Sequence, residues 1–193
     1  MKELFPGRLN KSNYVTKGDL LLASPFLEDP YFERSVVLLC EHRESEGSFG
    51  LILNKVATID ISTLEESEHL ENNLFMGGPV ERNTLHFIHR FADIKNSIPV
   101  KDGIFWGGDY EQLKSYHNLG LVNSSNCRFF VGYSGWAPGQ LKEEIEQETW
   151  IIARNQLSLL FELPAQELWQ RILREMGGKY RAMSHFPANA QLN

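Results

Sequence analysis

The sequence predicts an α/β protein of the α+β type: one compact domain in which a coiled, mixed sheet is flanked by helices. Several short runs are hydrophobic at every position, which indicates strands that are covered on both faces. Strands and helices follow one another without the regular alternation of a βαβ fold. The length of 193 residues, of which 42% are hydrophobic and 23% charged, suits one globular domain.

The N-terminal third supplies three apolar strands. Residues 20–23 form a short buried strand that ends before Pro25. Residues 35–40 and 49–54 are each apolar almost throughout. The polar turn at residues 42–48 contains a glycine, so it predicts a hairpin between these two strands.

Shorter elements of both kinds fill the middle of the chain. Residues 62–70 predict a helix, because Ser and Thr can cap it and two Glu lie in its first turn. Residues 84–89 alternate between apolar and polar, which is typical of a half-exposed strand. A short strand at 104–106 runs into two glycines, and Asp109 is then expected to cap a helix over residues 110–117.

The C-terminal part contains the strongest helix signal. Residues 128–133 and 150–153 predict two further strands, and Pro138 opens a helix between them. Residues 165–176 carry an apolar stripe at helical spacing, and Gly177 is expected to end that helix.

The charge balance argues against a nucleic-acid partner. The chain has 19 Lys and Arg against 25 Asp and Glu, a net charge of −6, whereas nonspecific nucleic-acid binding depends on neutralising phosphates. Four basic residues gather near the C-terminus: Arg171, Arg174, Lys179 and Arg181. We interpret them as cations that complement a helix dipole, with a local nucleic-acid patch as the alternative.

Cysteine usage and the absence of an apolar leader favour the cytoplasm. Cys40 and Cys127 each lie in an apolar run, and two such cysteines do not make a disulfide framework. The opening residues lack the apolar core of a secretion signal, and the longest apolar runs are too short to cross a membrane. We therefore expect a cytoplasmic protein without a membrane partner.

Known catalytic and ligand motifs do not match. The glycine clusters spell neither a dinucleotide fingerprint nor a phosphate-binding loop. Ser134 lacks the second glycine of a nucleophile elbow and is interpreted as a turn residue, as are Gly132 and Gly135 beside it. No His or Cys pair has zinc spacing, so we expect no metal and no cofactor. The acidic run at residues 143–148 is interpreted as a solvated helix face.

Cys40, Glu41 and His42 are the one local group that could support redox chemistry. On a regular strand the side chains of Cys40 and His42 share a face, so a protonated imidazole would lower the pKa of the thiol. Burial in the same apolar run would raise that pKa and make the thiol inert. We favour the inert interpretation and keep Cys40 as a redox candidate.

Several stretches, taken together and in order, carry a family resemblance. They are GDLLLASP at 18–25, DPYF at 29–32, RSVVLLCEH at 34–42, GSFGLILN at 47–54, GGPV at 77–80, GIFWGGD at 103–109 and RFFVGYSGWAPGQL at 128–141, followed by Trp150 and Leu168–Trp169. Across residues 18–177 the chain resembles the AlgH (YqgE) family of bacterial proteins. It departs from that pattern at Ser134, where Ala is common, and at Lys55 and Val56, where Arg-Pro is usual.

The resemblance implies a compact α/β domain built on a coiled, branched sheet. It divides the chain into a lead segment at 1–17, an AlgH-like domain at 18–177 and a C-terminal tail at 178–193. It also implies a role in transcriptional regulation, taken from the name of one member. It supplies no active site, substrate or cofactor.

Most motif residues have structural explanations, which leaves four polar ones as ligand-binding candidates. Trp106, Trp136 and Trp169 are expected in the core, and Arg34 is expected to pair with an acid. The four candidates lie at strand and turn ends: Arg34, His42, Asn54 and Gln140. We expect any pocket to form where the strand ending at Asn54 approaches the 132–140 loop.

These observations favour a non-enzymatic regulatory or binding protein. Its partner would be an unidentified protein or small molecule, and the chain would be a monomer or a weak homodimer. Two alternatives remain: a hydrolase or transferase with an unrecognised pocket, and a nucleic-acid binder that uses the basic C-terminal segment.

Overall fold

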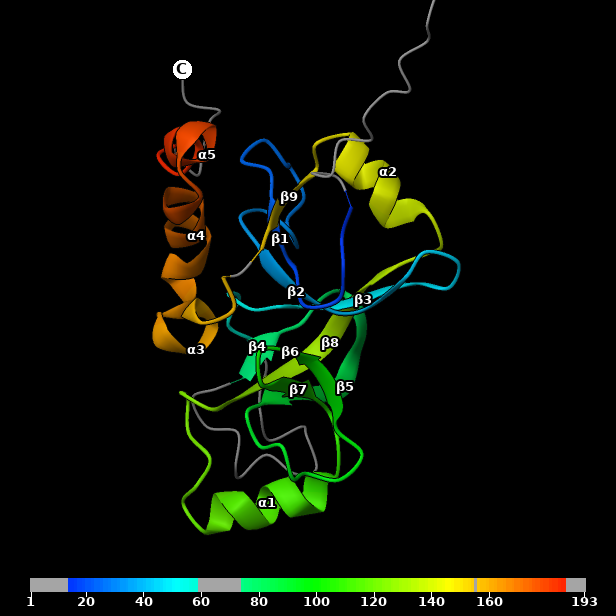
Figure 1. Ribbon diagram of the computed structural model, residues 1–193, viewed down its shortest axis with the longest axis vertical. Coiled ribbons are helices and arrows are strands. Elements are labelled where there is room, and N and C mark those ends of the chain that lie inside the picture. Colours follow the sequence, from blue (N-terminus) through cyan, green and yellow to red (C-terminus); the bar gives the residue numbers. More distant parts are fainter. Residues whose placement is uncertain (1–13, 59–73, 155, 187–193) are drawn as a thin grey trace, which may run out of the picture.

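A computed structural model describes residues 14–58, 74–154 and 156–186 (Figure 1). Its strands are β1 (Leu20–Ala23), β2 (Val36–Arg43), β3 (Gly47–Ile52), β4 (Leu74–Met76), β5 (Val80–His89), β6 (Ile98–Lys101), β7 (Ile104–Trp106), β8 (Cys127–Trp136) and β9 (Trp150–Ala153). Its α-helices are α1 (Tyr110–Asn118), α2 (Gln140–Glu146), α3 (Leu159–Glu162), α4 (Leu168–Met176) and α5 (Gly178–Met183), with a 3-10 turn at Ala165–Glu167. The expected helix at 62–70 lies outside the described residues.

The strands form one branched sheet of mixed direction. The main path runs β6-β7-β5-β8-β3-β2-β1-β9, and β4 pairs with β8 off this path. Strand β8 is the branch point: β5 runs antiparallel along one edge, while the other edge takes β4 in parallel and then β3 antiparallel. The fold class and the branched sheet implied by the resemblance are therefore confirmed.

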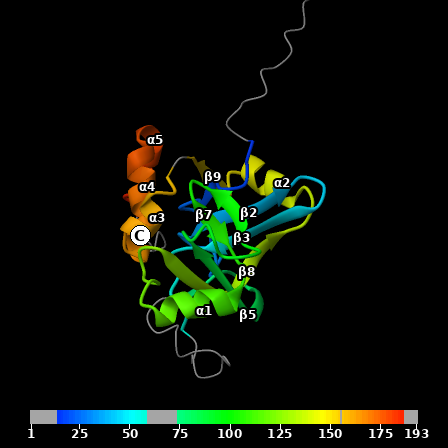
Figure 2. The ribbon, with the colours of Figure 1, turned by 60° about the horizontal axis from the view of Figure 1, so that its bottom comes forward.

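Strands β1, β2 and β3 are buried on both faces, as their continuous apolar runs predict. Alternate residues enter two separate cores. Leu20, Leu38 and Leu51 pack in the core that contains Trp169 of α4, whereas their neighbours Leu21, Val37 and Ile52 pack in the core that contains Leu141 of α2. Helices α3, α4 and α5 form a column beside the sheet, away from α2 (Figures 1 and 2).

A third core lies under α1, at the end of the molecule away from α2 (Figure 1). Leu113 of α1 packs with Phe87 of β5 and Phe129 of β8. The helix begins as the sequence predicts, because the Asp109 carboxylate accepts a hydrogen bond from the backbone N–H of Gln112 at 3.0 Å.

Gly132 and Gly135 lie within β8, so their interpretation as turn residues is wrong. Gly132 has φ of +67°, and a Cβ there would lie 2.6 Å from the Gly78 carbonyl oxygen. The pairing of β5 with β8 is irregular between Val80 and Leu85, which is where Gly132 faces the β5 chain. Ser134 is also part of β8, where its buried hydroxyl donates to the Gly77 carbonyl at 3.0 Å. Close approach of two backbones explains Gly132, whereas a Cβ at Gly135 would meet only the Tyr133 ring, at 3.1 Å.

Other short elements extend the predicted set. Sequence patterns miss β4, β6 and α3, each of only three or four residues. Helix α5 occupies Gly178–Met183, within the segment expected as a tail, and its Tyr180 and Met183 pack against the core.

Candidate functional site

Two of the four predicted ligand-binding residues hold the start of β2 to the end of β3. The Asn54 side chain accepts a hydrogen bond from the Val36 N–H at 2.8 Å and donates to the Arg34 carbonyl at 2.9 Å. The Arg34 guanidinium lies 4.8 Å from the centre of the Trp169 ring and donates to the Phe186 carbonyl. Among the described residues the partners of Arg34 are an aromatic face and a carbonyl, and none of them is the acid that the sequence analysis expects.

The other two predicted ligand-binding residues, His42 and Gln140, lie toward the opposite end of β3. His42 Nδ1 is 2.8 Å from the Ser48 hydroxyl across the hairpin, and Ser48 is paired with Trp136. Gln140 follows Trp136 and bonds to the Ala137 N–H and to Glu144. Asn54 is six residues beyond Ser48, which is roughly 20 Å at the rise of a strand. The structure therefore does not bring Asn54 and Gln140 together around one pocket.

Cys40 is fully buried, and burial raises the pKa of its thiol far above its usual range. A bulge between Leu39 and Glu41 interrupts the regular alternation on which a shared face with His42 depends. Burial likewise raises the pKa of Cys127 to about 12. These environments favour the inert interpretation of both thiols.

Glu144 is more than part of a solvated helix face, which corrects the interpretation of the acidic run. Its Oε2 accepts hydrogen bonds from the indole N–H groups of Trp136 and Trp150, both at 2.7 Å, and its Oε1 accepts one from Gln140. The carboxylate therefore fastens α2 to β8 and β9.

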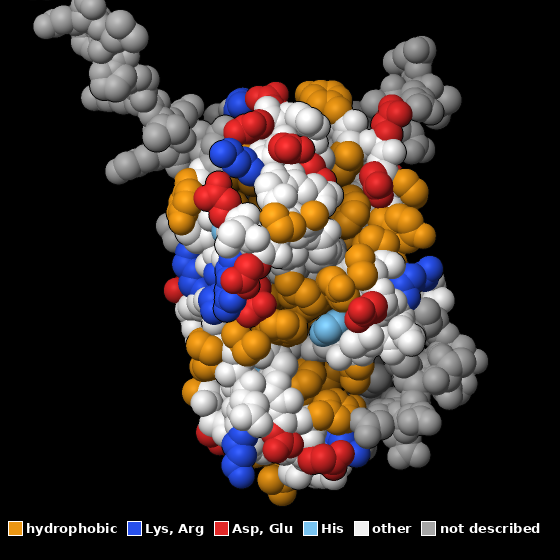
Figure 3. Space-filling view, turned by 90° about the vertical axis from the view of Figure 1, so that its right-hand side faces the viewer, with side chains coloured by type: hydrophobic (Ala, Val, Ile, Leu, Met, Phe, Trp, Pro, Cys, Tyr) orange, Lys and Arg blue, Asp and Glu red, His pale blue; other side chains and the backbone are white. Residues whose placement is uncertain are grey.

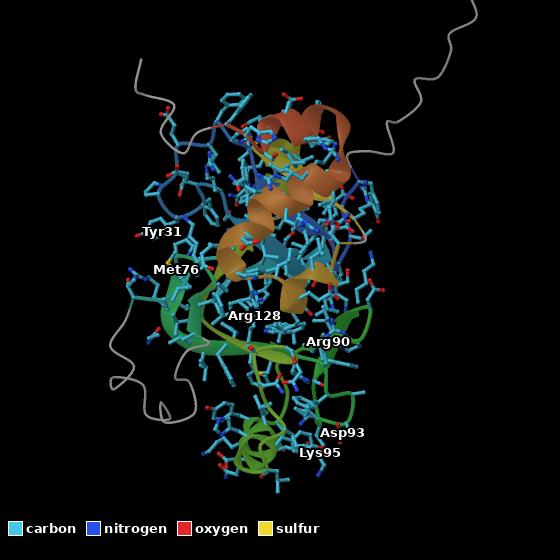
Figure 4. The ribbon with its side chains drawn as sticks, turned by 90° about the vertical axis from the view of Figure 1, so that its left-hand side faces the viewer. Tyr31, Met76, Arg90, Asp93, Lys95 and Arg128 are labelled. Carbon is cyan, nitrogen blue, oxygen red and sulfur yellow. The ribbon has the colours of Figure 1, made fainter. Side chains whose placement is uncertain are left out.

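Arg128 is a second buried charge with a structural explanation. Its guanidinium donates to the Leu53 and Leu163 carbonyls and lies over the rings of Phe75 and Phe161. Arg90 lies over the same Phe161 ring, and the two arginines are close together in Figure 4. Burial lowers the pKa of Arg128 to about 10. The Arg128 side chain therefore links the residues that follow β3 and α3 to β8.

The strongest candidate site is a group of four half-buried rings from four strands, here called the aromatic cluster: Phe49, His86, Trp106 and Tyr133. The Phe49 ring centre lies 4.4 Å from that of Trp106, 4.8 Å from that of Tyr133 and 5.3 Å from that of His86. On the side where β3, β5 and β8 reach the surface, hydrophobic side chains gather across the middle of the molecule (Figure 3). Trp106 is thus half-buried, which corrects its expected place in the core.

A cavity of about 400 Å³ adjoins the cluster. We call it the aromatic cavity; its lining includes Leu85, His86, Asn96, Ile98, Trp106 and Gly108. It opens because the chain after β7 leaves β5: the Gly107 N–H still donates to the Phe87 carbonyl at 2.9 Å, but no described strand continues along that edge. Gly107 and Gly108 line the cavity at this point and contribute no side chains to it. Cavities of this size hold small organic ligands.

His86 carries the unmatched polar atom of this region. Its Nε2 is buried and has no hydrogen-bond partner among the described residues. Burial lowers the pKa of the imidazole, so the ring is neutral at pH 7 and can donate or accept one hydrogen bond. His89, on the other face of β5, is satisfied by the Gly107 carbonyl at 2.9 Å and the Phe91 N–H at 3.2 Å. Of the two histidines of β5, His86 is therefore the one whose ring keeps a nitrogen without a described partner, and it lines the cavity.

Sequence reasoning missed the aromatic cluster as a unit. The alternation at 84–89 does predict that His86 and His89 face opposite sides, and this is confirmed because they belong to different ring clusters. Phe49, Trp106 and Tyr133, however, are each indistinguishable in sequence from core residues. Only the pairing of four distant strands brings them to one place.

Neither a metal centre nor a membrane span is found in the described part of the chain. Within residues 14–58, 74–154 and 156–186, no group of three or more His, Cys, Asp or Glu could hold a metal ion. In the same ranges, no helix has the length and apolar character needed to cross a membrane.

Comparisons with known proteins agree with the fold. The model of the family described as AlgH-like matches residues 20–181. A UPF0301 protein of Cytophaga hutchinsonii is 47% identical over 93% of this chain and 100% of its own length, and one of Chlorobium limicola is 41% identical over 96% and 100%. The crystal structure of a Corynebacterium diphtheriae protein has a TM-score of 0.70 at 25% identity, covering 95% of this chain and 100% of its own. The solution structure of AlgH from Pseudomonas aeruginosa has a TM-score of 0.66 at 23% identity, covering 97% and 98%, and is similar in fold.

Proposed function

Because this chain belongs to the AlgH-like family, for which the resemblance supplies no active site, we propose a function from its own geometry: a non-enzymatic binding protein that holds a small planar ligand in the aromatic cavity. The observation that carries the proposal is the buried Nε2 of His86, without a partner among the described residues, beside a cavity of ligand size. A buried polar atom without a hydrogen bond costs about 1–3 kcal/mol, which a ligand group can recover.

The rings around His86 indicate the class of ligand. The half-buried indole of Trp106 lines the cavity, and aromatic pairs favour offset stacking or edge contacts. Leu85 and Ile98 supply apolar walls, and Asn96 supplies one amide. A planar heteroaromatic ring with one hydrogen-bonding edge, such as a nucleobase, satisfies all three features.

The test uses four probes that differ in shape and polarity: adenosine, uridine, indole and the non-planar cyclohexanol. Saturation-transfer NMR on the full chain should show ring contacts for the planar compounds and none for cyclohexanol. Trp106→Leu should weaken binding at least 10-fold, whereas Tyr14→Leu, which changes an exposed aromatic outside the cluster, should leave it unchanged. Equal signals from all four probes, or no signal at millimolar concentration, would refute the proposal.

The hydrolase or transferase alternative has one observation in its favour. It predicts a cavity that holds a group with a shifted pKa, and His86 has a lowered pKa beside the aromatic cavity. The same NMR samples test for hydrolysis, because a hydrolase that takes nucleosides would add water across the glycosidic bond of adenosine or uridine and release the free base over hours, while a binding protein returns the nucleoside unchanged.

A regulatory role and a cytoplasmic location remain predictions. The net charge of −6 argues against direct nonspecific binding to DNA, and Arg171 of the basic segment is paired with Glu175 at 2.8 Å. We therefore place any regulation at the level of ligand or protein binding. The buried free thiols of Cys40 and Cys127 support a reducing compartment.

A further inference from the structure

The two end strands of the sheet differ in how their outer edges are protected. Strand β6 carries Pro99 and Lys101, and proline and lysine both discourage the addition of another strand. Strand β9, at the other end, reads Trp-Ile-Ile-Ala and has neither. Within the described part of the chain, β9 pairs only with β1, so its outer edge keeps free backbone groups.

A cavity of about 550 Å³ runs along this outer edge. We call it the edge groove. Consecutive residues of β9, Trp150, Ile151 and Ile152, form its floor. The groove lies between the end of α2 and the α4–α5 pair, so it is a channel between two walls rather than a flat surface.

The two walls differ in chemistry. The α4–α5 wall presents Met176, Tyr180 and Met183, which are largely apolar and adaptable in shape, together with the cation of Lys179. The wall at the end of α2 presents Glu146 and Glu148, both exposed and neither in an ion pair within the described ranges. The two glutamates precede β9 and Arg154 follows it, so the groove is acidic at one end and basic at the other. An occupant that suits it is apolar along its middle, positively charged where it meets the glutamates and free of cations toward Lys179 and Arg154.

The shape of the groove decides between two kinds of occupant. A second copy of this chain would bring an identical channel, and two concave edges do not fill one another. An extended peptide is narrow enough to enter the channel and has the backbone groups that an open edge requires.

We propose that the edge groove binds an extended segment of a partner protein, which adds to β9 as a further strand and carries a lysine or arginine opposite Glu146 and Glu148. Backbone hydrogen bonds to β9 hold the segment. Its apolar side chains on one face pack against the α4–α5 wall, and the basic residue fixes its direction. This binding is independent of the aromatic cavity.

The experiment measures binding of four fluorescent octapeptides to the full chain by polarisation. All four alternate Val and Thr. One ends in two Lys and one ends in two Glu. The other two repeat the lysine peptide with N-methyl groups on alternate amides, one along each edge of the strand. The lysine peptide should bind at least 10-fold more tightly than the glutamate peptide. N-methylation along one edge of the peptide should abolish binding, whereas N-methylation along the other edge should not, because a strand bonds through only one edge.

Charge reversal supplies the matched variants. Glu146→Lys with Glu148→Lys should reverse the preference and favour the glutamate peptide. Glu143→Lys, on the same helix but outside the groove, should not change it. Circular dichroism of each variant checks the fold. Binding that ignores peptide charge and N-methylation, failure of every peptide to bind at millimolar concentration, or a dimer that buries β9 in sedimentation would each overturn the proposal.

Discussion

The β1–β2–β3 region and the β5–β7 region use the same sheet in different ways. In the first, helices cover both faces, and all of β1, the first five residues of β2 and the last three of β3 are buried. In the second, α1 covers one face, while the aromatic cluster on the other face stays half-exposed beside a cavity. We therefore expect the first region to supply most of the stability, while the second leaves part of its aromatic surface exposed beside the cavity.

The largest expected effect separates two tryptophans, one from each region. Trp169 is 2% exposed and its indole N–H donates to the Ala23 carbonyl at 2.9 Å. Trp169→Ala should lower the free energy of unfolding by about 3–5 kcal/mol, because it leaves a large cavity and an unmatched carbonyl. Trp106→Ala in the aromatic cluster should cost only about 1 kcal/mol, since the ring is partly exposed. Urea unfolding measures both, and equal losses would contradict the proposed division.

The next effect concerns the junction between the regions, where β8 passes Gly78 and Val80. Gly132→Ala should destabilise the protein by about 2–3 kcal/mol, from a left-handed backbone together with a clash against two carbonyl oxygens. Gly139 has φ of +81°, and a Cβ at that position would have open space around it, so Gly139→Ala should cost only about 1 kcal/mol. Thermal unfolding compares the pair. If Gly132→Ala is the milder change, the close approach does not govern this junction.

A smaller effect is expected at Glu144, which links α2 to Trp136 of β8 and Trp150 of β9. Glu144→Gln should lower stability by about 1–2 kcal/mol: the amide oxygen can still accept from both indoles, but the charge that strengthens those bonds is lost, and the amide NH₂ cannot accept the hydrogen bond that Gln140 donates to Oε1. Its exposed neighbour Glu143 has no such partners in the described structure, and Glu143→Gln should be close to neutral. Chemical denaturation followed by tryptophan fluorescence reports both changes.

The smallest effect is a pH dependence that arises in the β5–β7 region. Burial is the main cause that lowers the pKa of His89 and of His86 in the folded protein. Below about pH 6.5 the unfolded chain therefore binds protons that the folded chain does not, and stability falls as the pH falls toward the folded pKa values. His89→Gln should reduce this slope between about pH 7 and 5. Denaturation midpoints across that pH range measure the slope. An unchanged slope in His89→Gln would contradict the conclusion that His89 contributes to the pH dependence.

Particular elements explain which features could be predicted. Local interactions between residues close together in the chain determine three of the predicted features: the strand at 20–23, the Asp109 cap and the helical stripe at 165–176. The sequence pattern is therefore sufficient to predict them. Strands β4 and β6 are too short to show a period, and β6 contains a proline. Asn54 and Gln140 both follow apolar strands, yet antiparallel pairing sends them to opposite ends of β3.

The candidate site was less accessible to prediction than the fold. Nothing local distinguishes Phe49, Trp106 and Tyr133 from buried aromatics, and the unmet Nε2 of His86 is defined by what surrounds it. Glu144 is similar: in sequence it is one of several glutamates in an acidic run, and its two indole donors come from different strands.

The sequence alone determined the family, the α/β class and the strands buried on both faces, because local apolar runs and turn residues encode them. Tertiary structure alone decided which aromatic rings meet, which histidine lacks a partner and which sheet edge stays open. Those features arise from the pairing of strands that are distant along the chain, and the physical forces that select that pairing act on the whole core at once.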